Sequence, residues 1–322
     1  MAGLPAISLV GPRACGKTTS ARRLAADTVS LNKAEDAAAF LASPDAALAR
    51  LAEPALVDEW QDAPPVLGAV KRAVDEDPRA GRFILTGSVS IETGTKTWPA
   101  TGRVTRLNMY ALTQREILGV SGELFVDRAV RAEQAELPGA DRRLNVFDYL
   151  ALAAAGGFLD VVIRRSGLAR ELWLASYLVE LLSKDAKRAG TGTAIDYTRL
   201  AAYATAVAAS SAKVSDTFAA SQIRPELAVS RLRPTLHHLR DKGGRHEVDT
   251  VLDYGARGVV GIEVKSSSAP SRDDAKHLLW LRERLGERFA AGLVLHTGGH
   301  TFELSDKITA APISTLWAAD RH

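Results

Sequence analysis

The first half of the chain alternates short apolar runs with segments of helical periodicity. The apolar runs lie at 7–10, 55–57 and 83–85, and the helical patterns lie at 17–26, 37–51 and 66–74. Apolar runs this short are typical of buried strands when turn residues bound them. Strands that alternate with helices predict a parallel sheet covered by helices on both faces.

The second half begins with helical patterns and then returns to strand patterns. Residues 170–185 form a helical pattern with four leucines on one face, and another at 197–212 follows a glycine-rich link at 189–193. The strand patterns lie at 236–239, 247–252, 259–264 and 292–296, with a helical pattern at 272–285. We therefore predict an α/β protein with a sheet domain at 1–145, a helical segment at 146–215 and a second α/β domain at 216–322.

Composition and charge narrow the class of protein. The chain has 322 residues, of which 46% are hydrophobic and 25% are charged, as in ordinary globular proteins. A single cysteine excludes an internal disulfide framework, and no signal-peptide pattern is present. The most apolar stretch, 149–159, is shorter than the roughly 20 residues that cross a bilayer. We predict a cytoplasmic protein without a membrane partner, and its net charge of +3 permits an anionic partner without requiring one.

A glycine-rich loop follows the first apolar run and opens the first helical pattern. Its residues, which fit G-x-x-x-x-G-K-[ST] at every fixed position, are Gly11, Pro12, Arg13, Ala14, Cys15, Gly16, Lys17 and Thr18. In such a loop the backbone N–H groups surround phosphate oxygens, Lys17 reaches the β and γ phosphates, and the Thr18 hydroxyl binds Mg²⁺. An ordinary glycine turn is the alternative, but the strand–loop–helix context favours a site for ATP and Mg²⁺ that extends to Thr19. We interpret Cys15 as a small filler rather than a nucleophile.

Polar residues end the next two apolar runs. Asp58 and Glu59 directly follow one run, and Thr86 and Ser88 end the other. We expect Asp58 to hold Mg²⁺, directly or through water, and Glu59 to orient and polarise the attacking water. A solvated strand end explains an isolated Asp-Glu pair, but the upstream P-loop favours the catalytic interpretation. We expect Thr86 or Ser88 to lie between the carboxylates and the γ-phosphate.

Arg103 is a candidate for the group that stabilises charge on the transferred phosphoryl group. An arginine can serve this purpose in its own subunit or across a subunit interface. A surface or structural salt bridge is an equal alternative for Arg103.

Several motifs occur in a fixed order along the first half. They are G-x-x-x-x-G-K-T at 11–18, L-V-D-E-x-Q at 56–61, L-T-G-S at 85–88, Gly102-Arg103, and L-T-Q-R-E at 112–116. In this order they resemble one group of bacterial and archaeal AAA-superfamily ATPases, which carry a C-terminal domain of unknown function similar to PD-(D/E)XK nucleases. The resemblance covers 7–158 and resumes over 216–317. It implies a P-loop AAA-type ATPase domain followed by an α/β nuclease-like domain.

The chain departs from this group near Ser215. Members of the group carry a further helical, winged-helix-like stretch before the nuclease-like part, whereas here 210–214 leads almost directly to Asp216. We predict that a segment is missing from the sequence near Ser215.

A carboxylate–lysine pattern lies in the second α/β region. Asp249, Glu263 and Lys265 have the D…(D/E)-x-K form, and Glu263 and Lys265 share one face of a strand because they are two residues apart. We expect the two carboxylates to bind a second divalent ion while Lys265 steadies or activates water for attack on a phosphodiester. The resemblance places Asp216 on a helix that completes the metal site. Charged residues on an exposed strand face are the alternative.

Basic residues lie just upstream of this pattern. They are Arg224, Arg231, Arg233, Arg240, Lys242 and Arg245. They are candidates for contacts with nucleic-acid phosphates, and a solvated surface is the alternative.

Three functions are compatible with these sites. The leading one is an ATPase that controls a nuclease-like, nucleic-acid-facing domain. The others are a metal-dependent DNA endonuclease gated by ATP and a non-hydrolysing nucleotide switch that binds a protein partner. A homo-oligomer is compatible with each of them.

Overall fold

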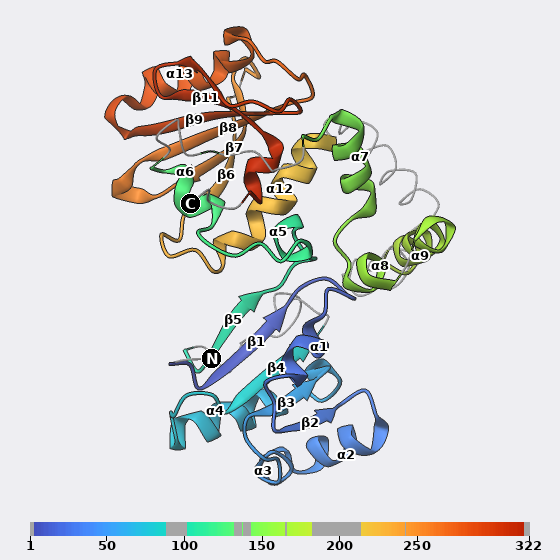
Figure 1. Ribbon diagram of the computed structural model, residues 1–322. Coiled ribbons are helices and arrows are strands. Elements are labelled where there is room, and N and C mark those ends of the chain that lie inside the picture. The colour runs from blue at the N-terminus through green and yellow to red at the C-terminus, as the bar shows by residue number, and fades with distance from the viewer. Residues whose placement is uncertain are drawn as a thin grey trace. The chain divides into compact units, whose positions relative to one another are not determined.

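The computed structural model describes residues 3–87, 102–131, 137, 143–164, 166–181, 214–241 and 243–318. These residues belong to two compact units, each built around its own sheet (Figure 1). The first unit contains the residues up to Ala111 together with Phe158–Ile163, and the second contains Leu112–Gly157 and most of the remaining described residues. The predicted α/β class is confirmed. The glycine-rich link, the helical pattern at 197–212, Ser88 and Lys242 lie outside the described residues.

The first unit contains a five-stranded parallel sheet in the order β2-β3-β4-β1-β5. Its strands are β1 (Ala6–Val10), β2 (Asp27–Ser30), β3 (Ala55–Asp58), β4 (Phe83–Gly87) and β5 (Val104–Asn108). The three predicted strands form the centre of this sheet. The sequence pattern missed β2 and β5 because they are edge strands, in which exposed polar residues interrupt the apolar ones.

The helices of the first unit are short. Those before β4 are α1 (Lys17–Arg22), α2 (Ala34–Ala42), α3 (Pro44–Ala49), the 3₁₀ turn η1 (Trp60–Asp62) and α4 (Val66–Glu76). The helix expected at 37–51 is divided in two because Pro44 cannot continue the hydrogen-bond pattern of α2 and instead begins α3. Helix α4 buries Val66, Val70 and Val74 in a core shared with Val57 and Phe83. This core fixes the ends of β3 and β4, where the candidate site lies.

The second unit contains a mixed sheet of six strands in the order β10-β11-β9-β8-β7-β6. Its strands are β6 (Thr235–Arg240), β7 (Glu247–Asp253), β8 (Val259–Lys265), β9 (Phe289–His296), β10 (Phe302–Ser305) and β11 (Ile308–Pro312). Strands β6, β7 and β8 are antiparallel, whereas β8, β9 and β11 are parallel. Strand β11 was not predicted, because Thr309, Ala310 and Ala311 do not form an apolar run.

Different helices cover the two faces of this sheet. Helix α13 (Lys276–Leu285) packs on the face of Val259, and α12 (Val214–Leu227) packs on the face of Ile262. Helices α6 (Phe125–Ala129) and α7 (Val146–Ala155) join the α12 side of the core. The 3₁₀ turns of this unit are η4 (Gly255–Arg257), η5 (Arg272–Ala275), η6 (Gly286–Arg288) and η7 (Ile313–Leu316).

A buried polar network explains why residues 112–131 belong to the second unit, although we predicted a boundary near 145. The Asp127 carboxylate accepts hydrogen bonds from the Ser230 hydroxyl at 2.5 Å and from the backbone N–H groups of Arg231 and Leu232 at 3.2 Å. The backbone N–H of Gln114 in α5 (Gln114–Ile117) donates to Gln222 of α12. These hydrogen bonds, of which those of Ser230 and Gln114 are buried, tie the segment to α12 and to the residues just before β6.

The remaining helices are α8 (Leu159–Arg164) and α9 (Gly167–Glu180). The leucine face predicted at 170–185 is not buried by the described residues, since no side chain of α9 is buried. Helix α12 runs without interruption through Ser215, while the residues before Val214 lie outside the described part. No described helix combines the length and the apolar character that a bilayer span requires.

Candidate functional site

The glycine-rich loop lies where the sequence predicts it, between β1 and α1. Gly16 has a φ of 99° and Ala14 a φ of 59°, so the loop passes twice through left-handed backbone conformations. A side chain at Gly16 would strain the backbone at this φ, which is why glycine suits the position. Loops with alternating backbone handedness turn successive N–H groups toward one point and form anion-binding nests.

The Lys17 side chain is buried, and its ammonium group lies within the loop. Its Nζ donates hydrogen bonds to the carbonyl oxygens of Gly11 at 2.9 Å and Pro12 at 2.7 Å. Hydrogen bonds from an ammonium group to phosphate oxygens are stronger than those to neutral carbonyls. The ammonium can therefore exchange these two carbonyls for the phosphates of a nucleotide.

Strand β4 lies between β1 and β3, and this order brings a threonine to the acidic strand end. Thr86 is level with Leu9 of β1 on one side and with Asp58 of β3 on the other. The Asp58 carboxylate oxygen Oδ1 accepts hydrogen bonds from the hydroxyls of Thr18 at 2.9 Å and Thr86 at 2.5 Å. The structure thus brings together the P-loop hydroxyl, the acid and the hydroxyl at the end of β4.

The residues present fit Mg²⁺ and a nucleoside triphosphate. Magnesium prefers hard oxygen ligands, and it is commonly held by one or two protein oxygens together with substrate phosphates. The Thr18 hydroxyl and the Asp58 carboxylate supply such oxygens 2.9 Å apart. Cys15 is buried, and this burial raises the pKa of its thiol, so the thiol stays protonated, as expected of a small filler.

Glu59 occupies a tight turn directly after β3. Its backbone is left-handed, with φ 52° and ψ 47°, and the buried Trp60 follows it. The Glu59 carboxylate accepts a hydrogen bond from Nε2 of Gln61. Gln61 had no predicted role, although the D-E-x-Q motif at 58–61 contains both residues.

Arg103 lies at the amino-terminal ends of the parallel strands, whereas the P-loop lies at their carboxyl ends. Val104, the next residue, is level with Ala6 at the start of β1, whereas the P-loop follows the end of β1. The five residues of β1 place its two ends about 16 Å apart. Arg103 forms an ion pair with Asp75 at 2.6 Å. The prediction that it acts on a nucleotide in its own subunit is therefore wrong, and action across a subunit interface stays a prediction.

The carboxylate–lysine pattern of the second unit lies on the β7–β8 hairpin, as the spacing predicted. The Asp249 carboxylate accepts a hydrogen bond from the backbone N–H of Val264 at 3.0 Å, which places it on β8 between Glu263 and Lys265. The Lys265 ammonium forms a 2.9 Å ion pair with Glu263, which is 2% exposed. A register shift in the β6–β7 pairing faces this part of β7, and bulges of this kind often redirect side chains beside functional sites.

Asp216 does not complete a three-carboxylate metal site with Asp249 and Glu263. Within the described ranges, no three side chains of His, Cys, Asp or Glu lie close enough together to hold a metal ion. The reason lies in the alternation of β8. Val264 faces α12, which carries Asp216, so the flanking Glu263 and Lys265 lie on the opposite face.

A histidine cluster that the sequence did not indicate lies on the α13 side of this sheet. The ring of His246 stacks on Trp280 at a centroid distance of 4.2 Å and meets His277 edge-on at 6.1 Å. Burial lowers the pKa of His277, and the charges of Lys276 and Lys265 lower it further. The cluster has no sequence signal because His246, which precedes β7, is 31 residues away from His277 in α13.

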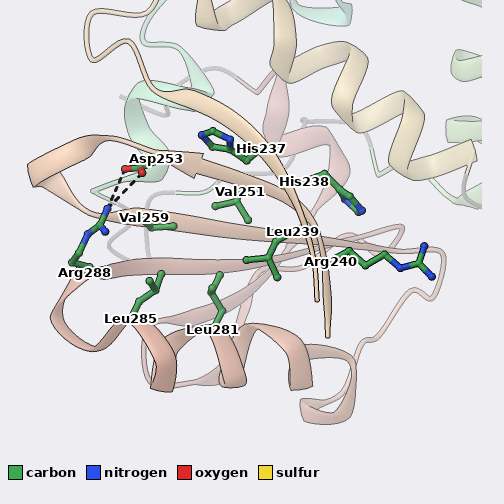
Figure 2. Close-up of a pocket in the computed structure, with 10 residues that line it drawn as sticks. All are labelled: His237, His238, Leu239, Arg240, Val251, Asp253, Val259, Leu281, Leu285 and Arg288. Atoms are coloured by element: carbon green, nitrogen blue, oxygen red, sulfur yellow. Dashed lines mark hydrogen bonds and ion pairs between the residues drawn. The ribbon is translucent and has the colours of Figure 1, made fainter. Parts of the chain in front are cut away.

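A groove of about 350 Å³ opens between the edge strand β6 and α13 (Figure 2). Figure 2 shows its apolar floor, formed by Leu239, Val251, Val259, Leu281 and Leu285. Arg240 and Arg288 mark its two ends, and Arg288 pairs with Asp253 at 3.5 Å. The described basic residues that are candidates for contacts with nucleic acid are all exposed. They are Arg224, Arg231, Arg233, Arg240 and Arg245. Their contact with nucleic acid stays a prediction.

Comparison with protein families agrees with the two-part organisation. A comparison with curated proteins found no match. Residues 212–316 match the model of a domain of unknown function, DUF4143. Residues 4–118 match the model of an AAA domain, and this range contains the P-loop, Asp58, Glu59 and Thr86. The N-terminal part of the chain is therefore similar to AAA domains, and the C-terminal part is similar to the DUF4143 family.

Proposed function

We propose that this protein binds and hydrolyses ATP at the P-loop of its N-terminal domain. The observation that carries the proposal is the shared hydrogen bonding of Asp58 to Thr18 and Thr86. It assembles the oxygen ligands for Mg²⁺ beside a loop built to surround phosphates. The match to an AAA domain supports ATPase activity as the general class.

Each residue has a separate task in the proposed reaction. Lys17 binds the β and γ phosphates, while the Thr18 hydroxyl and Asp58 hold Mg²⁺, which neutralises negative charge on the phosphates. Glu59 accepts a proton from the water that attacks the γ-phosphorus, and the products are ADP and phosphate. Thr86 keeps the Asp58 carboxylate oriented through its 2.5 Å hydrogen bond.

Replacing Glu59 with glutamine tests this assignment. We expect Glu59→Gln to reduce steady-state phosphate release by about a hundredfold or more, because the amide cannot accept the proton. The affinity for ATP should change little, since Glu59 is not a phosphate or metal ligand in the proposal. Glu35→Gln, which alters an exposed carboxylate at the start of α2, is the matched control. Equal turnover of Glu59→Gln and the wild type would contradict the role of Glu59.

A second candidate function is metal-dependent cleavage of a nucleic acid by the C-terminal domain, under the control of ATP. The observation that favours it is the placement of Asp249, Glu263 and Lys265 around one point of β8. Two carboxylates can bind a divalent ion whose other ligands are water and substrate oxygens, and the Lys265 ammonium can steady the attacking water. The resemblance to PD-(D/E)XK nucleases agrees with this candidate.

Incubation with supercoiled plasmid DNA tests the second candidate. With Mg²⁺ or Mn²⁺ the wild type should produce nicked or linear DNA, and Lys265→Ala should slow this cleavage at least tenfold. Arg284→Ala, which removes an exposed cation of α13, is the control for a general loss of positive charge. If the wild type cleaves no DNA in any of three conditions, namely without nucleotide, with ATP or with ADP, the proposed nuclease activity is contradicted.

A further inference from the structure

A glutamine in the turn after β3 is the strongest feature that the proposed reaction leaves unused. We propose that Gln61 is a positioning residue that holds the Glu59 carboxylate in place for catalysis. The inference rests on the proposed ATPase function and deepens it. It begins from the hydrogen bond that Nε2 of Gln61 donates to Oε2 of Glu59.

The charge of Glu59 determines which end of the Gln61 amide faces it. A carboxylate only accepts hydrogen bonds, so the NH₂ end of the amide is attracted to it and the carbonyl end is repelled. A hydrogen bond to a charged group is about twice as strong as one between neutral groups. The bond therefore restrains the carboxylate at the end of a flexible side chain that is itself only partly buried.

Packing against the end of β4 holds the other end of the amide. The Oε1 atom of Gln61 is buried, has no hydrogen-bond partner among the described residues and lies beside Gly87. A Cβ atom at Gly87 would collide with Oε1 of Gln61 and would come within 3.0 Å of Nε1 of Trp60. Only glycine leaves the space that the Gln61 amide occupies.

These contacts connect both acidic residues of the site to the end of one strand. Thr86 of β4 donates to Asp58, and Gly87, the next residue, supports Gln61, which donates to Glu59. The metal-holding acid and the water-activating acid are thus aligned by adjacent residues of β4. A small error in the position of a catalytic group slows a reaction strongly, so this support has a direct kinetic consequence.

Replacement of Gln61 with methionine separates positioning from folding and from binding. Methionine has a similar length but cannot donate a hydrogen bond. We expect Gln61→Met to lower kcat about tenfold or more while the Kd for ATP, measured by equilibrium binding, changes less than twofold. In the Glu59→Gln background the same substitution should cause no further loss, because the carboxylate that it positions is already absent.

Gly87→Ala tests the same support from the other side. The added methyl group must displace the Gln61 amide, so kcat should fall to a similar extent with unchanged affinity for ATP. The double variant Gln61→Met/Gly87→Ala should be no slower than the slower single variant. Gly68→Ala is the matched control, because its Cβ would meet only the flexible end of Arg72.

The outcomes distinguish this inference from the proposed function. Wild-type turnover above that of Lys17→Ala, together with an unchanged or raised kcat in Gln61→Met, would overturn the positioning role and leave the ATPase intact. Additive losses in Gln61→Met/Gly87→Ala, or a loss in affinity for ATP equal to the loss in kcat, would also overturn it. A wild type that releases no more phosphate than Lys17→Ala would remove the proposed function and this inference together.

Discussion

Replacing Lys17 with alanine should weaken ATP binding about ten- to a hundredfold and reduce phosphate release to background. Hydrogen bonds to charged groups contribute about 1.5–3 kcal/mol each, and every 1.4 kcal/mol is tenfold in affinity. The ammonium group lies inside the loop, where its two carbonyl partners can be exchanged for phosphate oxygens. No other described lysine belongs to this loop, so no neighbouring ammonium replaces it.

Equilibrium binding of a fluorescent ATP analogue and a coupled phosphate-release assay measure the two effects of Lys17→Ala. Lys71→Ala is the matched control, because Lys71 is a surface residue of α4 that pairs with Asp75. Exposed pairs of this kind contribute little to stability, so the control should behave as the wild type. Unchanged binding and turnover in Lys17→Ala would refute the assignment of the P-loop as the ATP site.

Replacing Asp127 with alanine should lower the free energy of unfolding of the second unit by about 3 kcal/mol. The substitution removes the acceptor of the buried Ser230 hydroxyl and of the partly buried backbone N–H of Arg231, while the Leu232 N–H keeps only its 3.1 Å hydrogen bond to the Ser230 hydroxyl oxygen. Each buried group left unsatisfied costs about 1–3 kcal/mol. Burial also raises the pKa of the neighbouring Glu226 to about 7, so this region already contains an acid that is costly to ionise.

Urea unfolding followed by tryptophan fluorescence measures the effect of Asp127→Ala, because Trp317 is buried in the core of the same unit. A fall in the transition midpoint with an unchanged slope would report lost stability. Asp306→Ala, which removes a carboxylate with an 84% exposed side chain, should leave the midpoint unchanged. Equal midpoints for Asp127→Ala and the wild type would mean that the network does not stabilise the unit.

Local patterns were sufficient to predict that the residues of the proposed ATP site lie together, because these residues follow buried strands. The central strands β1, β3 and β4 are apolar, and their carboxyl ends carry the P-loop, Asp58 and Thr86. In a parallel sheet these ends meet at one edge, so residues far apart in sequence converge there. The edge strands β2 and β5 lack the apolar pattern, and without β5 the position of Arg103 could not be inferred.

The carboxylate–lysine site shows the limit of the same reasoning. Spacing was enough to place Glu263 and Lys265 on one face, because alternation along a strand is local. The position of Asp216 depends on which face α12 covers, and this is decided by the packing of Phe218 and Ile223 against β8. The prediction that Asp216 joins Asp249 and Glu263 in a metal site was wrong for this reason, since no local pattern specifies the face that a helix will cover.

The sequence by itself determined the α/β class, the glycine-rich loop between β1 and α1 and the acids at the end of β3, because each depends on residues close together along the chain. Only the tertiary structure placed Arg103 at the amino-terminal ends of the parallel strands, joined residues 112–131 to the second unit and brought Gln61 against Gly87. These features depend on strand order and on side-chain packing between distant segments. Both are properties of the whole fold rather than of any single segment.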